Sequence, residues 1–309
     1  MALIFKTDIA RGGAWRAAFA KQLPDVELRL WPEVGVPDEI EYAVVWQPPA
    51  GFLASLPNLK AVFSIGAGID HLLADPELPR GVPIIRMVEP GLTVGMTQFV
   101  TMACLMLHRS MIDYRNQQIA HHWEEISQEP PENRRIGILG LGHLGGEAAK
   151  ALRGFGFPVS GWSRSRKQIE GVTSYAGEAE LPEFLSRSNI LVSLLPLTPQ
   201  TENMIDAKLL AGLPQGASFV SAGRGLQVVE EDLLDALDSC RLSGAILDVF
   251  REEPLPKESR FWDHPKVIVL PHVASMTNPA TAVGSIVENI RHIQRGETPL
   301  HQVDLQKGY

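Results

Sequence analysis

Three polar residues with side chains suited to acid–base and anion-binding chemistry follow strand-like runs in the second half of the chain. Arg224 lies between two glycines, Glu253 precedes a proline, and His272 follows one, at separations of 29 and 19 residues. Taken singly, such an arginine or glutamate is more often a surface charge, and such a histidine is more often structural. Parallel strands present their carboxyl ends at one edge of a sheet, so the joint placement predicts that the three residues meet at a ligand site.

A glycine turn lies upstream of these residues. A short apolar run leads into Gly140-x-Gly142-x-x-Gly145, and a helical pattern follows at once. The first glycine permits a tight turn, the second lets the backbone approach a pyrophosphate, and the third lets the helix pack on the strand. N–H groups at the start of that helix, at His143 and Leu144, would face the phosphates. The pattern predicts dinucleotide binding, and the alternative is a tight turn that binds nothing.

The end of the next strand-like run distinguishes between the two nicotinamide dinucleotides. An acidic residue there would bind the adenosine 2′-hydroxyl of NAD. In this chain the position falls near Ser163, 23 residues after Gly140, and the residues that follow are Arg164, Ser165 and Arg166, without an acid. Arginine suits a 2′-phosphate because its guanidinium donates hydrogen bonds in a fixed geometry. We therefore expect NADP(H) to be preferred over NAD(H), the alternative being a solvated basic turn.

Short apolar runs alternate with helical patterns in two series, which predicts parallel sheets built from strand–helix–strand units. Strands are expected at 2–6, 26–31, 42–46, 59–65 and 82–87, and again at 136–139, 158–162, 190–194, 218–221, 244–249 and 267–270. Helices are expected at 14–23, 51–56, 144–155, 181–186, 207–212, 230–239 and 283–293. The proline-free stretch Thr93–His122 predicts a long helix, broken near Ser110, that crosses into the second domain.

Composition is typical of a globular protein with a large core. Of 309 residues, 45% are hydrophobic and 21% charged, and the length suggests about two domains. The net charge of −8, without a Lys/Arg-dense run, argues against nucleic acid as a partner. No signal peptide and no apolar run of about 20 residues is evident, so we expect a cytoplasmic protein without a membrane partner. Cys104 and Cys240 are expected to be buried thiols, and no metal is expected.

Five motifs together resemble the D-isomer-specific 2-hydroxyacid dehydrogenase family. They are the glycine turn, Leu194–Thr201, Gly223–Gly225, Asp248–Pro256 and Pro271–Ala274. The resemblance covers essentially the whole chain, because Ser64–Asp70 resembles the family's substrate loop, and it is strongest to the glyoxylate/hydroxypyruvate reductase branch. It implies an α/β fold of two doubly wound parallel-sheet domains across an interdomain cleft. Residues 1–95 and 277–309 would form a flavodoxin-like substrate domain, and residues 96–276 a Rossmann NADP-binding domain.

The resemblance also implies roles for individual residues. His272 would donate a proton to the alkoxide left by hydride transfer, and Glu253 would orient the imidazole and favour imidazolium. Arg224 would bind the substrate carboxylate and polarise the carbonyl. Further cofactor contacts are implied for Leu195, Pro196, Thr201, Ala222, Gly223, Asp248, His272 and Ala274. Further substrate contacts are implied for Trp46 and for the backbone N–H groups of Ile65, Gly66 and Ala67. Arg86 is either a second cation on the carboxylate side or, as we expect, a surface charge.

The expected function is the NADPH-dependent reduction of glyoxylate, hydroxypyruvate or a similar small 2-keto acid to the D-2-hydroxy acid. The resemblance also implies a homodimer built on the Thr93–Trp123 region. Two alternatives stay open: a relative that acts on a bulkier 2-keto acid such as phenylpyruvate, and a non-catalytic regulator that senses dinucleotides. The joint presence of Arg224, Glu253 and His272 speaks against the regulator, because a sensor needs no proton donor.

Overall fold

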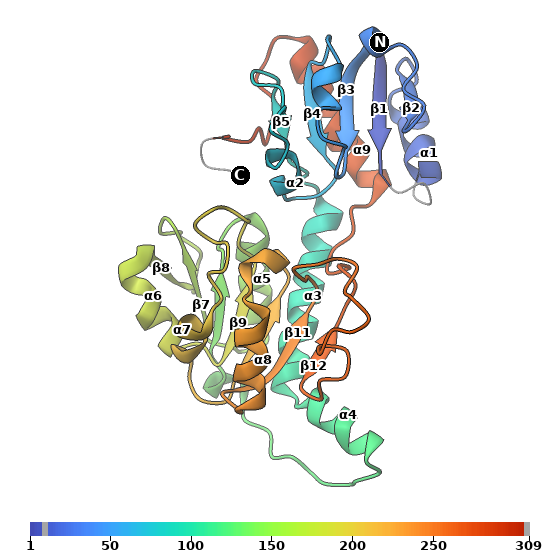
Figure 1. Ribbon diagram of the computed structural model, residues 1–309. Coiled ribbons are helices and arrows are strands. Elements are labelled where there is room, and N and C mark those ends of the chain that lie inside the picture. Colours follow the sequence, from blue (N-terminus) through green and yellow to red (C-terminus); the bar gives the residue numbers. More distant parts are fainter. Residues whose placement is uncertain (8–11, 306–309) are drawn as a thin grey trace. The chain divides into compact units, whose positions relative to one another are not determined.

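The computed structural model describes residues 1–7 and 12–305 and divides into two compact units (Figure 1). Unit 1 comprises Met1–Leu92 and Met276–Tyr309, and unit 2 comprises Thr93–Ser275. The last four residues of the expected 277–309 segment lie outside the described residues. Each unit is built on a parallel sheet with helices on both faces, so the predicted α/β class with two doubly wound sheets is confirmed.

Unit 1 has a five-stranded sheet in the order β2-β1-β3-β4-β5, with every pairing parallel. Its strands are β1 (Ala2–Lys6), β2 (Glu27–Leu30), β3 (Ile40–Val45), β4 (Ala61–Ser64) and β5 (Ile84–Ile85). Its helices are α1 (Gly12–Gln22), α2 (Asp70–Leu73) and α9 (Pro279–Gln294), with 3₁₀ turns at Pro37–Glu39 and Leu53–Ser55. Strands β1, β3 and β4 are almost wholly apolar because both faces of the sheet are covered. The helix expected at 51–56 is only a 3₁₀ turn, and α2 was not predicted.

Unit 2 has a seven-stranded parallel sheet in the order β12-β11-β10-β9-β6-β7-β8. Its strands are β6 (Ile136–Leu139), β7 (Val159–Ser163), β8 (Thr173–Ala176), β9 (Ile190–Ser193), β10 (Ala217–Ser221), β11 (Leu242–Leu247) and β12 (Val267–Val269). Six strands were expected, and the missed one is β8, a short edge strand that is only partly buried. The strand order reverses between β6 and β9, which is where ligands of such sheets bind. The glycine turn follows β6 and therefore lies at this point.

The helices of unit 2 cover the two faces of its sheet. They are α3 (Pro90–His108), whose first turn belongs to unit 1, α4 (Met111–Ile119), α5 (His143–Arg153), α6 (Gly177–Ser186), α7 (Ala207–Ala211) and α8 (Glu230–Asp238), with 3₁₀ turns at Pro131–Asn133 and Gly225–Gln227. One apolar cluster joins α3, α4 and α5 to one face, and another joins α6, α7 and α8 to the opposite face. Phe155 was expected on the buried face of α5 but is exposed, because the helix ends at Arg153.

The crossing helix α3 begins at Pro90, earlier than the expected Thr93, because the buried carboxylate of Glu89 accepts hydrogen bonds from the N–H groups of Gly91 and Leu92. The predicted break near Ser110 is confirmed, since that residue has a φ of 54° between α3 and α4. The expectation that no apolar stretch approaches the length of a membrane span was wrong. By length and composition alone α3 qualifies, and only 39% of its apolar window is buried within the chain.

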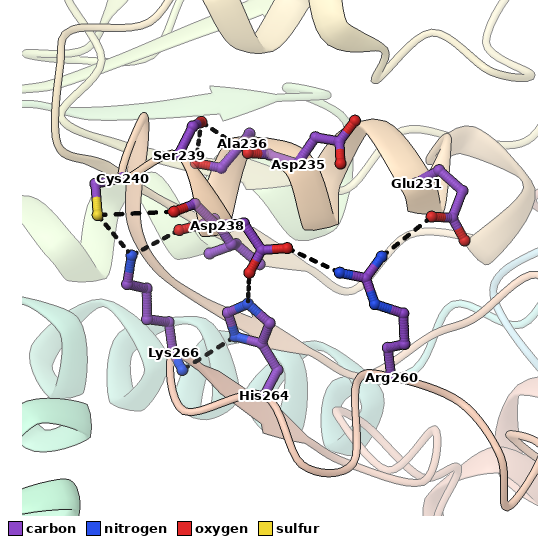
Figure 2. A network of polar contacts seen from close by, with 10 residues as sticks. Glu231, Asp235, Ala236, Asp238, Ser239, Cys240, Arg260, His264 and Lys266 are labelled. Carbon is purple, nitrogen blue, oxygen red and sulfur yellow. Dashed lines mark hydrogen bonds and ion pairs between the residues drawn. The ribbon is translucent and has the colours of Figure 1, made fainter.

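The two cysteines differ. Cys104 is buried as expected, and burial raises the pKa of its thiol. Cys240 is exposed, contrary to expectation, because it follows the end of α8 with a φ of 57° and turns away from the core. Figure 2 shows it beside Lys266, whose Nζ lies 3.1 Å from the sulfur. In the same network Asp238 contacts His264 and Arg260, so polar contacts tie the end of α8 to the segment before β12.

The third glycine of the turn packs against the first. A Cβ at Gly145 would lie 2.0 Å from the carbonyl oxygen of Gly140, a backbone atom that cannot rotate away. A Cβ at Gly142 would meet no atom within 4 Å, and Gly142 has an ordinary φ of −74°. Packing against the strand therefore requires glycine at 145, whereas the fold itself does not require glycine at 142.

Gly145→Ala should lower the free energy of unfolding by about 1–3 kcal/mol, the usual effect of overpacking a tight contact. Gly142→Ala is the matched control and should change it by less than about 0.5 kcal/mol, as open positions do. Urea unfolding followed by circular dichroism measures both. Equal stability of the two variants would contradict the contact between the first and third glycines.

Candidate active site

His272 and Glu253 form a hydrogen-bonded pair in unit 2. The Nδ1 atom of His272 lies 2.7 Å from Oε2 of Glu253, and about one third of each side chain is exposed. The other carboxylate oxygen, Oε1, accepts the N–H of Phe250 at 2.9 Å. His272 has a φ of 54°, and its own N–H donates to the carbonyl oxygen of Asp248. The imidazole is therefore oriented through its Nδ1 atom by a carboxylate that is itself held by the backbone.

The Glu253 carboxyl group is held in its ionised form. Burial raises its pKa, but the hydrogen bond from His272, the N–H of Phe250 and the charge of Arg224 together outweigh burial, so the net pKa is lowered. Asp248 shows the opposite balance: burial raises its pKa more than its hydrogen-bond donors lower it.

Asp248 holds the backbone that carries His272. Its Oδ1 atom accepts the N–H of Val273 at 2.7 Å, and its Oδ2 atom accepts the N–H of Ala274 at 2.9 Å. The residue follows β11 and is only 1% exposed, whereas His272 follows β12. The Asp248 side chain therefore links the carboxyl ends of two neighbouring strands and fixes the position of the backbone that carries His272.

Arg224 follows β10 and comes close to the loop that carries Glu253. A Cβ at Gly225 would lie 1.9 Å from the carbonyl carbon of Phe250, so only glycine allows the two loops to approach this closely. The Nη1 atom of Arg224 donates to the carbonyl oxygen of Gly223 at 2.9 Å. Unit 2 thus brings the arginine, the glutamate and the histidine together from three separate strand ends.

Gln227 is a buried residue of this site that the sequence did not reveal. Its Oε1 atom accepts the N–H of Arg224 at 3.2 Å, and its Nε2 atom donates to the carbonyl oxygens of Leu195 and Pro196 at 2.9 and 3.0 Å. Thr201 closes the same loop, since its hydroxyl donates to the carbonyl oxygen of Pro196 at 2.7 Å. Gln227 therefore fixes the loop after β9 relative to Arg224. A lone glutamine in a 3₁₀ turn carries no periodic signal that could have indicated this.

The glycine turn has the geometry of a phosphate cradle. Gly140 has a φ of 104° and directly follows β6. The open space beside Gly142 lies at the N-terminus of α5, an 11-residue helix. N–H groups and the positive dipole end of the helix are directed there. His143 is exposed, and its Nε2 atom lies 3.0 Å from Oγ1 of Thr93. The backbone present fits a pyrophosphate.

The basic loop at the end of β7 is held by its own polar groups. Ser163 is nearly buried, and its hydroxyl donates to the carbonyl oxygen of Ser165 at 2.8 Å. Arg164 is exposed, whereas Arg166 pairs with Glu180 of α6. No acidic residue lies among residues 163–167, in agreement with the sequence, and the first acid of the loop is Glu170.

The expected substrate loop of unit 1 follows β4. Its Gly66 lies against Trp46, because a Cβ there would be 2.9 Å from Cζ3 of the indole, and the indole also lies on His71 with ring centroids 4.4 Å apart. The N–H of Ile65 already donates to the carbonyl oxygen of Val45, so Ile65 does not offer the donor that was expected of it. Within residues 1–7 and 12–305, the N–H groups of Gly66 and Ala67 have no acceptor in the protein.

Arg86 is half-buried, and its burial lowers the pKa of the guanidinium, so the expectation of a surface charge was wrong. It follows β5, and the next residue, Met87, donates its N–H to the carbonyl oxygen of Gly66 at 3.2 Å. The described part of the chain holds no group of three His, Cys, Asp or Glu residues arranged to bind a metal ion.

Known proteins resemble this chain in sequence and in fold. The family model described as D-isomer specific 2-hydroxyacid dehydrogenase, NAD binding domain, matches residues 101–274. A family member from Xanthobacter autotrophicus Py2, solved with NADPH and MES, is 42% identical with a TM-score of 0.96, covering 100% of this chain and 99% of that one. An NADPH-dependent glyoxylate/hydroxypyruvate reductase from Sinorhizobium meliloti, solved with NADP and sulfate, is 40% identical with a TM-score of 0.94 and the same coverage.

A probable 2-hydroxyacid dehydrogenase from Rhizobium etli CFN 42, solved with NADP, HEPES and L(+)-tartaric acid, is 34% identical with a TM-score of 0.91, again covering 100% of this chain and 99% of that one. More than half of the chain matches the family model, and relatives above 30% identity match along its whole length. The protein, which combines a glycine turn with the Glu253–His272 pair, therefore belongs to the D-isomer specific 2-hydroxyacid dehydrogenase family.

Proposed function

We propose that the protein reduces a small 2-keto acid of the glyoxylate/hydroxypyruvate type to the D-2-hydroxy acid with NADPH. The observation that carries this proposal is the 2.7 Å hydrogen bond between His272 and Glu253, in the unit that also holds the glycine turn. The relatives solved with NADPH or NADP support the cofactor, and the Sinorhizobium meliloti reductase supports the substrate class. Membership of the family supports the general reaction, the interconversion of a 2-keto acid and a 2-hydroxy acid.

The residues have complementary tasks in such a reduction. The dinucleotide supplies a hydride when it is bound. Ionised Glu253 stabilises the imidazolium form of His272 through Nδ1, and the Nε2 proton passes to the oxygen of the former carbonyl group. Arg224 binds the substrate carboxylate and polarises the carbonyl. Unit 1 by itself offers two N–H donors suited to a carboxylate, at Gly66 and Ala67, with the indole of Trp46 against Gly66.

Cofactor binding is assigned to the backbone of the glycine turn and to the loop after β7. The N–H groups at His143, Leu144 and Gly145 bind the pyrophosphate, because they belong to the first turn of α5. Arg164 meets the 2′-phosphate, which needs a cation where NAD would need an acid. Leu195, Pro196, Thr201, Ala222, Gly223, Asp248 and Ala274 lie in the loops after β9, β10, β11 and β12 and complete the nicotinamide side of the site.

We further propose that the protein forms a homodimer through α3 and α4. These helices and Ala151 line a shallow groove of about 830 Å³. The groove is lined by Thr97, Gln98, Thr101, Met102, Leu105, Met106, Arg109, Met111, Tyr114 and Ala151. Most of the apolar window of α3 is not buried within the chain, and Met102 is 44% exposed. A second copy of the same helical face supplies apolar side chains to cover this surface, and a C2 pairing places each groove against its equivalent.

His272→Gln should lower kcat for glyoxylate reduction by about 10²–10⁴, the usual contribution of a general acid, while NADPH binding stays intact. In the parent enzyme the rate should fall as pH rises, because the proton donor is lost when the imidazolium deprotonates, and the variant should lose this dependence. NADPH oxidation at 340 nm and a fluorescence titration of NADPH measure the two properties. A flat pH profile of the parent enzyme, with the chemical step rate-limiting, would argue against His272 as the donor.

Arg164→Ala should raise KM for NADPH by about tenfold or more, because hydrogen bonds to charged groups contribute about 1.5–3 kcal/mol. KM for NADH should change little, since NADH has no 2′-phosphate. Initial rates at saturating keto acid provide both constants. An equal rise for both cofactors would refute the assignment of Arg164.

Met102→Glu should convert the dimer into a monomer, because pairing would bury an uncompensated carboxylate. Val36→Glu is the control, since this residue lies in unit 1 and is 55% exposed. Sedimentation velocity at micromolar concentration gives the mass of each variant. A monomeric parent protein, or a dimeric Met102→Glu variant, would rule out this interface.

A further inference from the structure

Arg166 and Glu180 connect the basic loop after β7 to the start of α6. The Nη2 atom of Arg166 donates to Oε1 of Glu180, and its Nη1 atom donates to the carbonyl oxygen of Ser174 in β8. The second carboxylate oxygen of Glu180 accepts the N–H of Ala176 at 2.7 Å. Glu180 therefore contacts both the basic loop and the junction between β8 and α6, and both Nη groups of Arg166 already have acceptors in the protein.

Two further contacts join the same segments. The N–H of Lys167 donates to the hydroxyl of Ser174 at 3.0 Å, and the indole N–H of Trp162 donates to the carbonyl oxygen of Gly177 at 2.8 Å. Figure 1 shows β7, β8 and α6 next to one another at one edge of the unit 2 sheet. The basic loop is thus attached before and after Arg164, which stands between the two attachments.

The Arg166–Glu180 pair also determines the net charge beside the basic loop. Glu180 places a carboxylate beside the loop that we assign to the 2′-phosphate, where an uncompensated negative charge would repel that group. Arg166 pairs with this carboxylate directly. The guanidinium side chain is 57% exposed and the carboxylate side chain 36% exposed, and a pair with this exposure contributes little to folding stability. Its loss should therefore appear in the choice of cofactor and not in the stability of the fold.

We propose that Glu180 and Arg166 are a positioning pair that sets the preference for a 2′-phosphorylated dinucleotide. Arg166 holds the basic loop and compensates the Glu180 carboxylate, and Arg164 is the residue that contacts the phosphate. This inference rests on the proposed function, and it gives Arg166 a different role from the direct cofactor contact that the sequence predicted. Glu180 lies 17 residues beyond Ser163, outside the range in which a sequence motif would place a cofactor residue.

The test compares the full-length enzyme with Arg166→Ala, Glu180→Gln and the double variant, using KM for NADPH and for NADH and the thermal midpoint. Arg166→Ala should raise KM for NADPH about fivefold or more, within the range of coupling in one hydrogen-bonded network, with little change for NADH. Adding Glu180→Gln should recover most of this loss, because the repelling carboxylate is then gone. The thermal midpoint should change little in all three variants.

Glu178→Gln in the Arg166→Ala background is the matched control. Glu178 lies in the same first turn of α6, and within the described residues it forms no ion pair. It should not recover NADPH binding. If Glu180→Gln gives no recovery, Arg166 binds the phosphate itself and the inference is wrong; equal recovery by Glu178→Gln would also overturn it, because the effect would then be one of net charge alone.

Arg164→Ala separates this inference from the proposed function. If Arg164→Ala abolishes the preference for NADPH while the Arg166 and Glu180 variants behave like the parent enzyme, only the positioning pair is refuted. If Arg164→Ala affects both cofactors equally, the assignment of the loop to the 2′-phosphate fails, whatever the other variants do.

Discussion

Glu253 stays ionised beside His272 although about two thirds of its side chain is buried. A hydrogen bond from the imidazole, an N–H of the backbone and the charge of Arg224 together outweigh the effect of burial. These three partners come from different loops, each of which follows a strand of the unit 2 sheet. The sheet therefore fixes the strand ends, the strand ends fix the loops, and the loops keep the carboxylate charged. Through Nδ1, that carboxylate then determines the orientation of the imidazole.

Features with a regular signal could be predicted from the sequence. The strands and the glycine turn have short-range patterns, and Arg224, Glu253 and His272 follow strands that end at one edge. Features that depend on distant partners could not be predicted. Strand β8 is short and partly exposed, Gln227 donates to the carbonyl oxygen of Pro196, 31 residues away, and Glu180 pairs with Arg166, 14 residues away. The N–H of Ile65 was expected to face the substrate, but it donates a backbone hydrogen bond to Val45. Cys240 was expected to be buried, but a left-handed turn places it at the surface.

The long helix α3 combines two requirements within one element. One side packs into the unit 2 core through residues such as Val100 and Cys104, which are fully buried. Another side carries Met102, Leu105 and Met106 of the groove, so the helix has apolar side chains on more than one side. A helix of that kind resembles a membrane span in composition. The side chains on the buried side of α3 are apolar because they pack into the unit 2 core, and the proposed second copy accounts for the apolar side chains on the remaining surface.

The basic loop beside β8 has a consequence for solubility. Strand β8 is the outer strand of the unit 2 sheet, and an outer strand offers unpaired backbone groups to any other extended chain. It spans only four residues, and Arg166 covers one of its carbonyl oxygens while Lys167 contacts the hydroxyl of Ser174. Charged side chains on a short outer strand discourage strand-by-strand association of neighbouring molecules. Arg166, whose pairing with Glu180 we propose to set the choice of cofactor, therefore also covers part of this edge of the sheet.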